Sequence, residues 1–249
     1  MWASFVFALQ FLTRIQIANP EWDYEKCGRG SAFFPVAGLV VGGLLVALKM
    51  VGALVFSPLI VAALILVAEV FITGGLHVDG FMDSMDGLYS GRDRERKLEI
   101  MKDSRVGSFG ALGLACLVLI KYVFYLELLK TNQVGWLLAV PVFGRWCMVY
   151  AIRFFPYLRK QGLGNPYSEH IGSREFIIAT AVLVGTLVLT LRGGSLAFLI
   201  PILLIHVWLK RVRDTLGGLT GDIYGAAEEI SEVMGLITVY LVYVKYLLV

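Results

Sequence analysis

Three aspartates lie close together in the segment from His77 to Gly87, at the end of a long apolar stretch. Asp79, Asp83 and Asp86 follow the spacing i, i+4, i+7, which places them within an arc of roughly 60° on one helix face. Carboxylates so close raise one another's pKa values in a poorly solvated place unless a cation offsets their charge. All-oxygen ligands favour a hard ion, so the spacing predicts a site for Mg²⁺, with Mn²⁺ as the alternative. The competing interpretation is an N-cap and a solvated helix face, where aspartate is common.

The same segment supplies the catalytic candidates. We assign Asp83 or Asp86 as a base and add His77, which is two residues from Asp79. Glu69 lies earlier, inside the apolar stretch, where an acid is costly and faces the protein interior or a water-filled cavity. Glu69 is therefore a candidate to bind the metal or to support its ligands, and a hydrogen bond between packed helices is an equal alternative.

A charged run over residues 91–105 ends in Lys102-Asp103-Ser104-Arg105, directly before the next apolar stretch. Its alternating charges are compatible with an amphipathic helix on the membrane surface. The last four residues fit that interpretation less well, and we expect their side chains to point back at the aspartates. Lys102, Ser104 and Arg105 would then hold phosphate oxygens, and Asp103 would add a metal ligand.

A glycine-rich segment, Gly217-Gly218-Leu219-Thr220-Gly221-Asp222, precedes the last apolar stretch. Exposed backbone N–H groups at such a turn can bind an anion at a helix start, so Gly217, Gly218 and Thr220 are assigned to phosphate binding. A helix that begins near residue 222 would direct Asp222 and Glu228 to the same aqueous face. We assign Asp222 to the metal site and Glu228 to the substrate.

The elements that must position these residues are membrane helices. The chain has 249 residues, 58% hydrophobic and 16% charged, with a mean hydropathy of +0.76, far from the balance of a soluble domain. We predict an all-α, polytopic membrane protein, one domain over residues 1–249, with about seven spans of the lipid bilayer. The spans are near residues 31–56, 58–76, 108–129, 135–152, 175–191, 195–209 and 231–248. Residues 1–15 are apolar but short, which predicts an interfacial or re-entrant helix.

The distribution of basic residues predicts the orientation of these spans. The connections on one side carry 16 of the 22 lysines and arginines; they are residues 14–30, 77–107, 153–174 and 210–230. By the positive-inside rule this side is cytoplasmic. The net charge of +3 therefore reflects topology, and no basic run with interleaved aromatics indicates nucleic-acid binding. Association into a homo-oligomer is left open.

Acidic clusters, nearby cations and a glycine-rich loop on one side of a membrane together indicate displacement at a diphosphate. Bound Mg²⁺ would neutralise the phosphates and stabilise the leaving group, which leaves positioning and electrostatics to the protein. Because no Ser/His/Asp set or activated cysteine offers a covalent route, direct attack by an acceptor hydroxyl is preferred.

Several motifs also resemble one known family. Thr73-Gly74-Gly75-Leu76-His77-Val78-Asp79-Gly80, followed by Asp83 and Asp86-Gly87, resembles the signature of the cobalamin synthase family. Further motifs resemble that family in the same order along nearly the whole chain: Phe11-Leu12-Thr13-Arg14, Arg29-Gly30, Met101-Lys102-Asp103-Ser104-Arg105, Gly162-Leu163-Gly164-Asn165 and Gly217-Gly218-Leu219-Thr220-Gly221-Asp222.

The resemblance implies an adenosylcobinamide-GDP ribazoletransferase of the bacterial inner membrane, with Mg²⁺ as cofactor and a cytoplasmic active site. A ribose hydroxyl of α-ribazole, or of its 5'-phosphate, would attack the corrinoid-side phosphorus of adenosylcobinamide-GDP and release GMP. The resemblance also implies substrate-binding roles for Arg14, Arg29 and Asn165.

Two other classes of protein compete with this interpretation. A CDP-alcohol phosphotransferase also uses spaced aspartates on membrane helices, but its pattern has Ala-Arg shortly after Asp-Gly, where this chain has Leu88-Tyr89. A cation transporter usually places its carboxylates near the membrane midplane, on broken helices in repeated halves. Here the acids are expected at one boundary, and the sequence shows no repeat.

Overall fold

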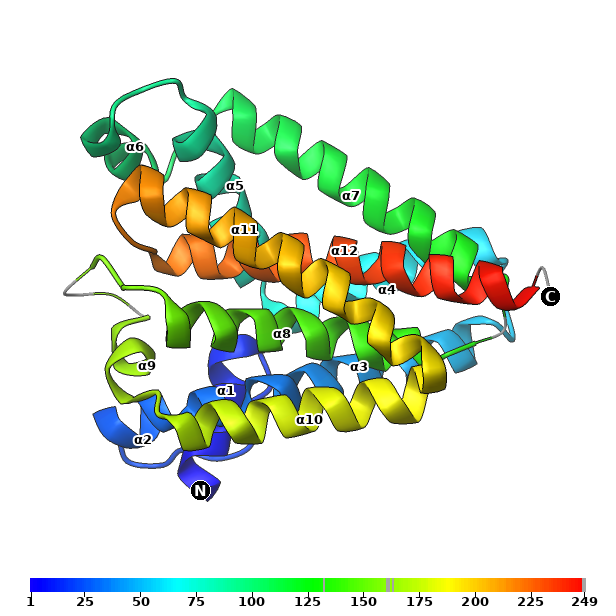
Figure 1. The fold of residues 1–249 in the computed structure, drawn as a ribbon. Coiled ribbons are helices and arrows are strands. Elements are labelled where there is room, and N and C mark those ends of the chain that lie inside the picture. Colours follow the sequence, from blue (N-terminus) through cyan, green and yellow to red (C-terminus); the bar gives the residue numbers. More distant parts are fainter. Residues whose placement is uncertain (132, 160–161, 163, 248–249) are drawn as a thin grey trace.

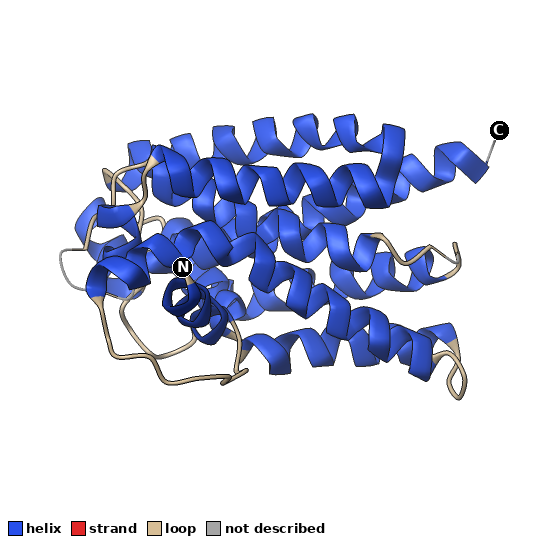
Figure 2. Ribbon diagram, turned by 90° about the horizontal axis from the view of Figure 1, so that it is seen from below, coloured by secondary structure: helices blue, strands red, loops and turns tan. Residues whose placement is uncertain are grey.

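The protein is built from α-helices, as the hydropathy pattern predicts. The computed structural model describes residues 1–131, 133–159, 162 and 164–247, with side chains described up to residue 243 (Figure 1). Within these ranges it contains helices and loops but no strand, apart from an isolated bridge between Tyr157 and Leu219 (Figure 2). Leu163, part of one family-like motif, lies outside the described residues.

Each predicted apolar span coincides with a helix. In the part of the chain that is described, four helical stretches are long and apolar enough to cross a bilayer, or five if the bent pair α4 and α5 forms one span. The number seven therefore stays a prediction. The longer helices are α3 (Phe34–Gly52), α4 (Pro58–Thr73), α5 (Leu76–Tyr89), α7 (Ser108–Leu129), α8 (Trp136–Phe154), α10 (Ser173–Leu191), α11 (Leu199–Leu216) and α12 (Gly221–Leu247). The shorter ones are α1 (Trp2–Leu12), α2 (Tyr24–Gly28), α6 (Arg94–Ile100) and α9 (Asn165–His170), with 3-10 helices at Arg29–Phe33 and Arg192–Phe198.

The four basic connections lie at the same end of the helix bundle. Helices α2, α6 and α9 mark three of them, and the turn from α11 to α12 is the fourth (Figure 1). This arrangement agrees with the prediction that the four connections lie on the same side of the membrane. That this side faces the cytoplasm stays a prediction.

A sharp bend separates α4 from α5. The two helices meet at 91°, and the turn between them uses Gly74 and Gly75, whose φ angles of 69° and 74° lie in the left-handed region that favours glycine. Arg14 packs against this turn, since a Cβ atom at Gly74 would lie 2.7 Å from its Nε atom. The bend turns α5 across the direction of the long helices (Figure 1), so α5 does not continue the path of α4.

Helix α5 crosses α12 at backbone distance. A Cβ atom at Gly80 would lie 2.9 Å from the carbonyl oxygen of Asp222, and one at Gly225 would lie 3.1 Å from that of His77. Both glycines are therefore needed for close helix packing, whereas Gly74 and Gly75 serve the bend. The main hydrophobic core lies beside this crossing, where α8 packs against α3, α10 and α12.

One predicted boundary was wrong. Part of the expected loop at 77–107 is α5, which is packed against α7 and α12. The expected helix start near residue 222 is confirmed, since α12 begins at Gly221, before the apolar span expected at 231–248. The charged residues on its first turns hide this start from a hydropathy scan, although several of them are buried in ion pairs.

Candidate active site

Aspartates from α5 and from the start of α12 meet at one cavity. Asp79 and Asp222 both line this cavity, which has a volume of about 190 Å³. The close contact of Gly80 with the backbone of Asp222 brings the two helices together here. The predicted convergence of the α5 aspartates with Asp222 is therefore seen in the structure, while their role as metal ligands stays a prediction.

Asp83 is the aspartate whose ionisation is most disturbed. Its pKa is raised from 3.8 to about 7, first by burial and then by the negative charges of Asp79, Asp222 and Asp86. A carboxyl group with such a pKa is partly protonated near neutral pH. A cation held among these residues would relieve the repulsion and favour the ionised form.

Asp86 already has hydrogen-bond donors within the protein. Its carboxylate oxygens accept hydrogen bonds from the backbone N–H groups of Gly107 and Gly110, each at 2.8 Å. Gly107 precedes α7, so Asp86 satisfies amides at the start of that helix. The capping interpretation therefore applies to Asp86, although the helix it caps is α7 and not its own. A role for Asp86 as ligand or base stays a prediction.

Arg159 completes the polar wall of the cavity. Its Nη2 atom donates to Asp222 at 2.7 Å, and the Thr220 hydroxyl donates to the same carboxylate at 3.1 Å. We did not single out Arg159 from the sequence. The available signal was a basic residue directly before the Gly162 loop, and Gly162 lines the same cavity.

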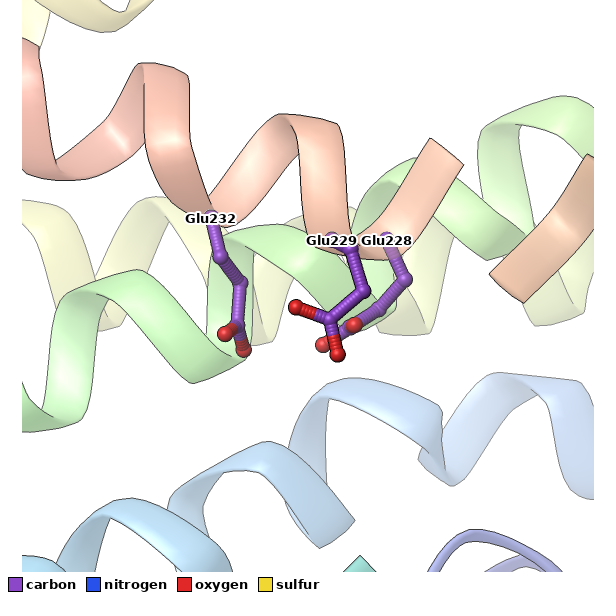
Figure 3. Close-up of side chains that lie close together, drawn as sticks. All are labelled: Glu228, Glu229 and Glu232. Carbon is purple, nitrogen blue, oxygen red and sulfur yellow. The ribbon is translucent and has the colours of Figure 1, made fainter. Parts of the chain in front are cut away.

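Glu228 was expected on the aqueous face, and this prediction was wrong. Its side chain is 1% exposed and pairs with Arg145. Glu228, Glu229 and Glu232 project together from α12 (Figure 3), and their carboxylate oxygens lie within 4.8 Å of one another. Residues 222 and 228 are separated by about 120° around a helix at 100° per residue, so they do not share a face.

Lysine and arginine from neighbouring spans neutralise these glutamates. The Nζ atom of Lys121 lies 2.9 Å from Glu69, 3.0 Å from Glu229 and 2.6 Å from Glu232. Arg145 pairs with both Glu228 and Glu232. Glu69 also accepts a hydrogen bond from the Tyr125 hydroxyl at 2.7 Å, so it packs helices together and does not line the aspartate cavity. We call Glu69, Lys121, Arg145, Glu228, Glu229 and Glu232 the buried glutamate cluster.

The sequence carried a signal for the buried glutamate cluster that we did not use. Lys121 and Arg145 lie inside predicted spans, and basic residues there usually pair with buried acids. His77 connects the cluster to the aspartate cavity. Its Nδ1 atom lies 3.2 Å from Glu228, its side chain is nearly fully buried, and the residue belongs to the cavity wall. A catalytic role for His77 stays a prediction.

The charged residues after α6 do not reach the cavity. Arg105 pairs with Asp103 at 2.6 Å, its own side chain is 87% exposed, and this pairing lowers the pKa of Asp103 to about 2. Lys102 and Ser104 are exposed as well. The expectation that these side chains point back at the aspartates was wrong, because Arg105 neutralises Asp103 locally. The segment instead contributes the backbone N–H of Gly107 to Asp86.

The remaining predicted residues surround the site without lining its polar wall. Arg29 is exposed and pairs with Glu25, and Arg14 is exposed beside the α4–α5 turn. The Asn165 side chain donates to Tyr24 and Glu169. Gly217 ends α11 with a φ of 83°, and Gly218 packs on Pro156 and Leu158. Their substrate-binding roles stay predictions.

Comparison with known proteins identifies the family. A family model described as "Cobalamin-5-phosphate synthase" matches residues 4–240. A protein named adenosylcobinamide-GDP ribazoletransferase from Roseiflexus sp. (strain RS-1) is 40% identical over 242 residues, which cover 94% of this chain and 88% of that protein. Proteins of the same name from Desulfitobacterium hafniense (strain Y51) and Brevibacillus brevis are 39% and 38% identical, over 92% and 94% of this chain and 93% and 96% of their own lengths. No solved structure matches the chain significantly.

These matches span nearly every helix described above, including both sides of the aspartate cavity. They confirm the resemblance seen in the sequence motifs, and the relatives are transferases by name. The chain therefore belongs to the cobalamin-5-phosphate synthase family.

Proposed function

We propose that this protein is an adenosylcobinamide-GDP ribazoletransferase that joins α-ribazole, or its 5'-phosphate, to the corrinoid half of adenosylcobinamide-GDP. The observation that carries the proposal is the meeting of Asp79, Asp222 and Arg159 at one cavity, in a chain whose relatives bear that enzyme's name. We place the reaction at the cytoplasmic face of the bacterial inner membrane. The start of α12 and the loop after α8, which line the cavity, lie at the end of the bundle that carries most of the basic residues (Figure 1).

Two aspartates of the cavity wall, Asp79 and Asp222, together with Asp83, offer a donor set of the kind that a hard divalent cation prefers. All three supply only oxygen atoms, and burial and the charges of its neighbours raise the pKa of Asp83. Arg159 offsets part of this charge at Asp222. We propose that these three aspartates hold Mg²⁺, with Mn²⁺ as the alternative. When bound, the ion neutralises the diphosphate and the departing phosphate oxygen.

Arg159 and Asp83 have distinct tasks in this mechanism. When adenosylcobinamide-GDP binds, the guanidinium of Arg159 donates hydrogen bonds to one of its phosphate oxygens and gives up its hydrogen bond to Asp222. A carboxylate oxygen of Asp83 accepts the proton of the attacking ribose hydroxyl. The new bond forms between that hydroxyl oxygen and the corrinoid-side phosphorus, and the bond to the bridging oxygen breaks, so GMP leaves. Asp83 is a better base than Asp86, whose oxygens already accept two amide N–H groups.

The family match also weighs against the two competing classes. The relatives that match along the chain are named neither as CDP-alcohol phosphotransferases nor as cation transporters. In addition, the glutamates that lie inside the helix bundle are paired with Lys121 and Arg145.

The proposal is tested by turnover of the purified full chain in lipid nanodiscs. With adenosylcobinamide-GDP, α-ribazole and Mg²⁺ we expect GMP and a completed corrinoid in equal amounts, and with EDTA we expect neither. Asp79→Asn and Asp83→Asn should each lower turnover by about 10²-fold or more while the far-UV circular dichroism stays unchanged. Asp214→Asn is the matched control, because Asp214 is an exposed acid paired with Arg213. Absence of product from folded protein would overturn the proposal, and normal turnover of either variant would remove that aspartate from the site.

A further inference from the structure

A second, larger cleft adjoins the aspartate cavity. Its volume is about 610 Å³, within the range of roughly 300–1,000 Å³ that is usual for small-molecule sites. It shares three wall residues with the aspartate cavity, namely Phe11, Gly162 and Tyr167. A ligand in the cleft can therefore extend into the place where the carboxylates meet. We call it the aromatic cleft.

Aromatic side chains dominate the wall of the aromatic cleft. Phe11 and Tyr167 lie with ring centroids 5.0 Å apart, and Phe7 and Trp22 lie 5.6 Å apart in an edge-on arrangement. Trp22 is 69% exposed and Tyr24 is 39% exposed. Such rings present flat apolar faces on which a planar aromatic ligand can stack.

The side-chain amides of the aromatic cleft already donate hydrogen bonds within the protein. The amide of Asn165 donates to the Tyr24 hydroxyl at 2.8 Å, and that of Gln10 donates to the Ala18 carbonyl at 2.6 Å. None of the described wall residues is charged. The cleft therefore suits a neutral planar group with few hydrogen-bonding atoms, and it does not suit a phosphate.

The reactants of the proposed reaction offer three large ring systems. Guanine carries several donors and acceptors that would lose water without gaining partners here, and the corrin ring carries polar amide arms. The benzimidazole base of α-ribazole is flat, neutral and mostly apolar. We propose that the aromatic cleft binds this base by stacking, and that the ribose extends past Phe11 and Tyr167 to the aspartate cavity. This inference rests on the proposed function.

Steady-state kinetics of the full chain in nanodiscs test the inference. Trp22→Ala should raise the KM for α-ribazole about fivefold or more, while kcat and the KM for adenosylcobinamide-GDP stay unchanged. Trp22→Phe keeps a stacking ring and should restore most of the affinity. Trp2→Ala is the matched control, since Trp2 is 64% exposed and does not line the cleft; an exposed tryptophan that serves only as an interfacial anchor leaves the KM unchanged.

Two kinetic results would overturn the inference. One is an unchanged KM for α-ribazole in Trp22→Ala. The other is a raised KM for adenosylcobinamide-GDP instead, which would assign the cleft to the donor.

Calorimetric titration with α-ribazole alone separates this inference from the proposed function. Unmodified protein that binds α-ribazole more tightly than Trp22→Ala supports the cleft even if no turnover occurs. Absence of binding by folded protein, or equal Kd values for the two proteins, overturns the cleft even where product forms.

Discussion

Helix α12 carries two sets of carboxylates that are neutralised in different ways. Asp222, at its first turn, faces Asp79 across a cavity with a single described basic side chain on the cavity wall, Arg159. Between about two and three turns later, Glu228, Glu229 and Glu232 lie against Lys121 and Arg145 from two other helices. Each of these glutamates contacts a cationic side chain of the protein itself, and the three carboxylates share two cations. Of the described aspartates at the cavity, only Asp222 has such a partner.

This difference shows how buried acids can be assigned to structure or to function. A carboxylate that has a fixed cationic partner on a packed helix joins those helices and has little capacity left for a ligand. Carboxylates that repel one another next to a cavity depend on something that arrives from outside. The two sets meet at the crossing of α5 and α12, where His77 and Asp79 lie two residues apart. The predictions below test this division.

The largest expected effect is on the buried glutamate cluster. Lys121→Met removes the cation shared by Glu69, Glu229 and Glu232, and leaving such charges unpaired should lower the free energy of unfolding by about 3–5 kcal/mol. Thermal unfolding in detergent measures the loss. Lys130→Met, on the connection after α7, removes an exposed pair with Glu127 and should change stability by at most about 1 kcal/mol. Equal stabilities of the two variants would contradict a structural role for the cluster.

Asp222→Asn tests the aspartate cavity, where we expect a loss of turnover without a loss of stability. Removal of one of the repelling carboxylates should leave the metal-free protein at least as stable as before, because Asp222 contributes to the raised pKa of Asp83. Turnover should nevertheless fall by about 10²–10³-fold. A variant that loses stability while it keeps its turnover would place Asp222 with the structural acids.

The crossing of α5 and α12 should tolerate little added volume. A Cβ atom in Gly80→Ala would meet the backbone of Asp222 at 2.9 Å, so the helices must separate, and we expect a loss of about 1–3 kcal/mol in stability together with weaker metal binding. Gly43→Ala and Gly185→Ala are the controls, since their Cβ atoms meet nothing within 4 Å. If Gly80→Ala behaves like these controls, the close crossing does not set the geometry of the site.

The pH dependence of metal binding should follow the ionisation of the Asp83 carboxyl group. Its pKa is raised from 3.8 to about 7 in the folded protein, so the native state binds more protons than the unfolded state between these values. Without a cation, stability therefore falls as the pH rises from about 4 to about 7 and is then level. A divalent cation binds the ionised form, so the increase in Tm on addition of Mg²⁺ should grow with pH up to about 7. Asp83→Asn should abolish that growth, and an increase independent of pH would exclude Asp83 as a ligand.

The smallest effect is expected for a residue outside both the buried glutamate cluster and the aspartate cavity. Arg105→Ala breaks an exposed pair with Asp103 and should leave kcat/KM within about twofold of the unmodified enzyme. A large rise in the KM for adenosylcobinamide-GDP would instead restore the phosphate-binding role predicted from the sequence, and would show that this segment moves onto the aspartate site during turnover.

The residues differ in how far the sequence could predict their places. The spacing of Asp79, Asp83 and Asp86 on one helix follows from local geometry, and the glycine-rich turn before Asp222 marked a helix start that the structure contains. Arg159 was missed because its distance from Asp222 depends on how the loop after α8 folds back. The prediction that Arg105 points at the aspartates was wrong because Asp103, two residues away, is the nearer acid, and Arg105 pairs with it.

The sequence by itself determined the class of the molecule, the helix positions and the family, because hydrophobic length, charge distribution and motif spacing are properties of short stretches of chain. Only the tertiary structure decided which acids join helices and which line a cavity. Asp86 caps α7, Glu228 pairs with Arg145, and Asp79 and Asp222 line a cavity. These outcomes depend on the bend at Gly74 and Gly75 and on the contact of α5 with α12. The contact of Gly80 with Asp222 joins residues more than a hundred positions apart, and no local pattern encodes it.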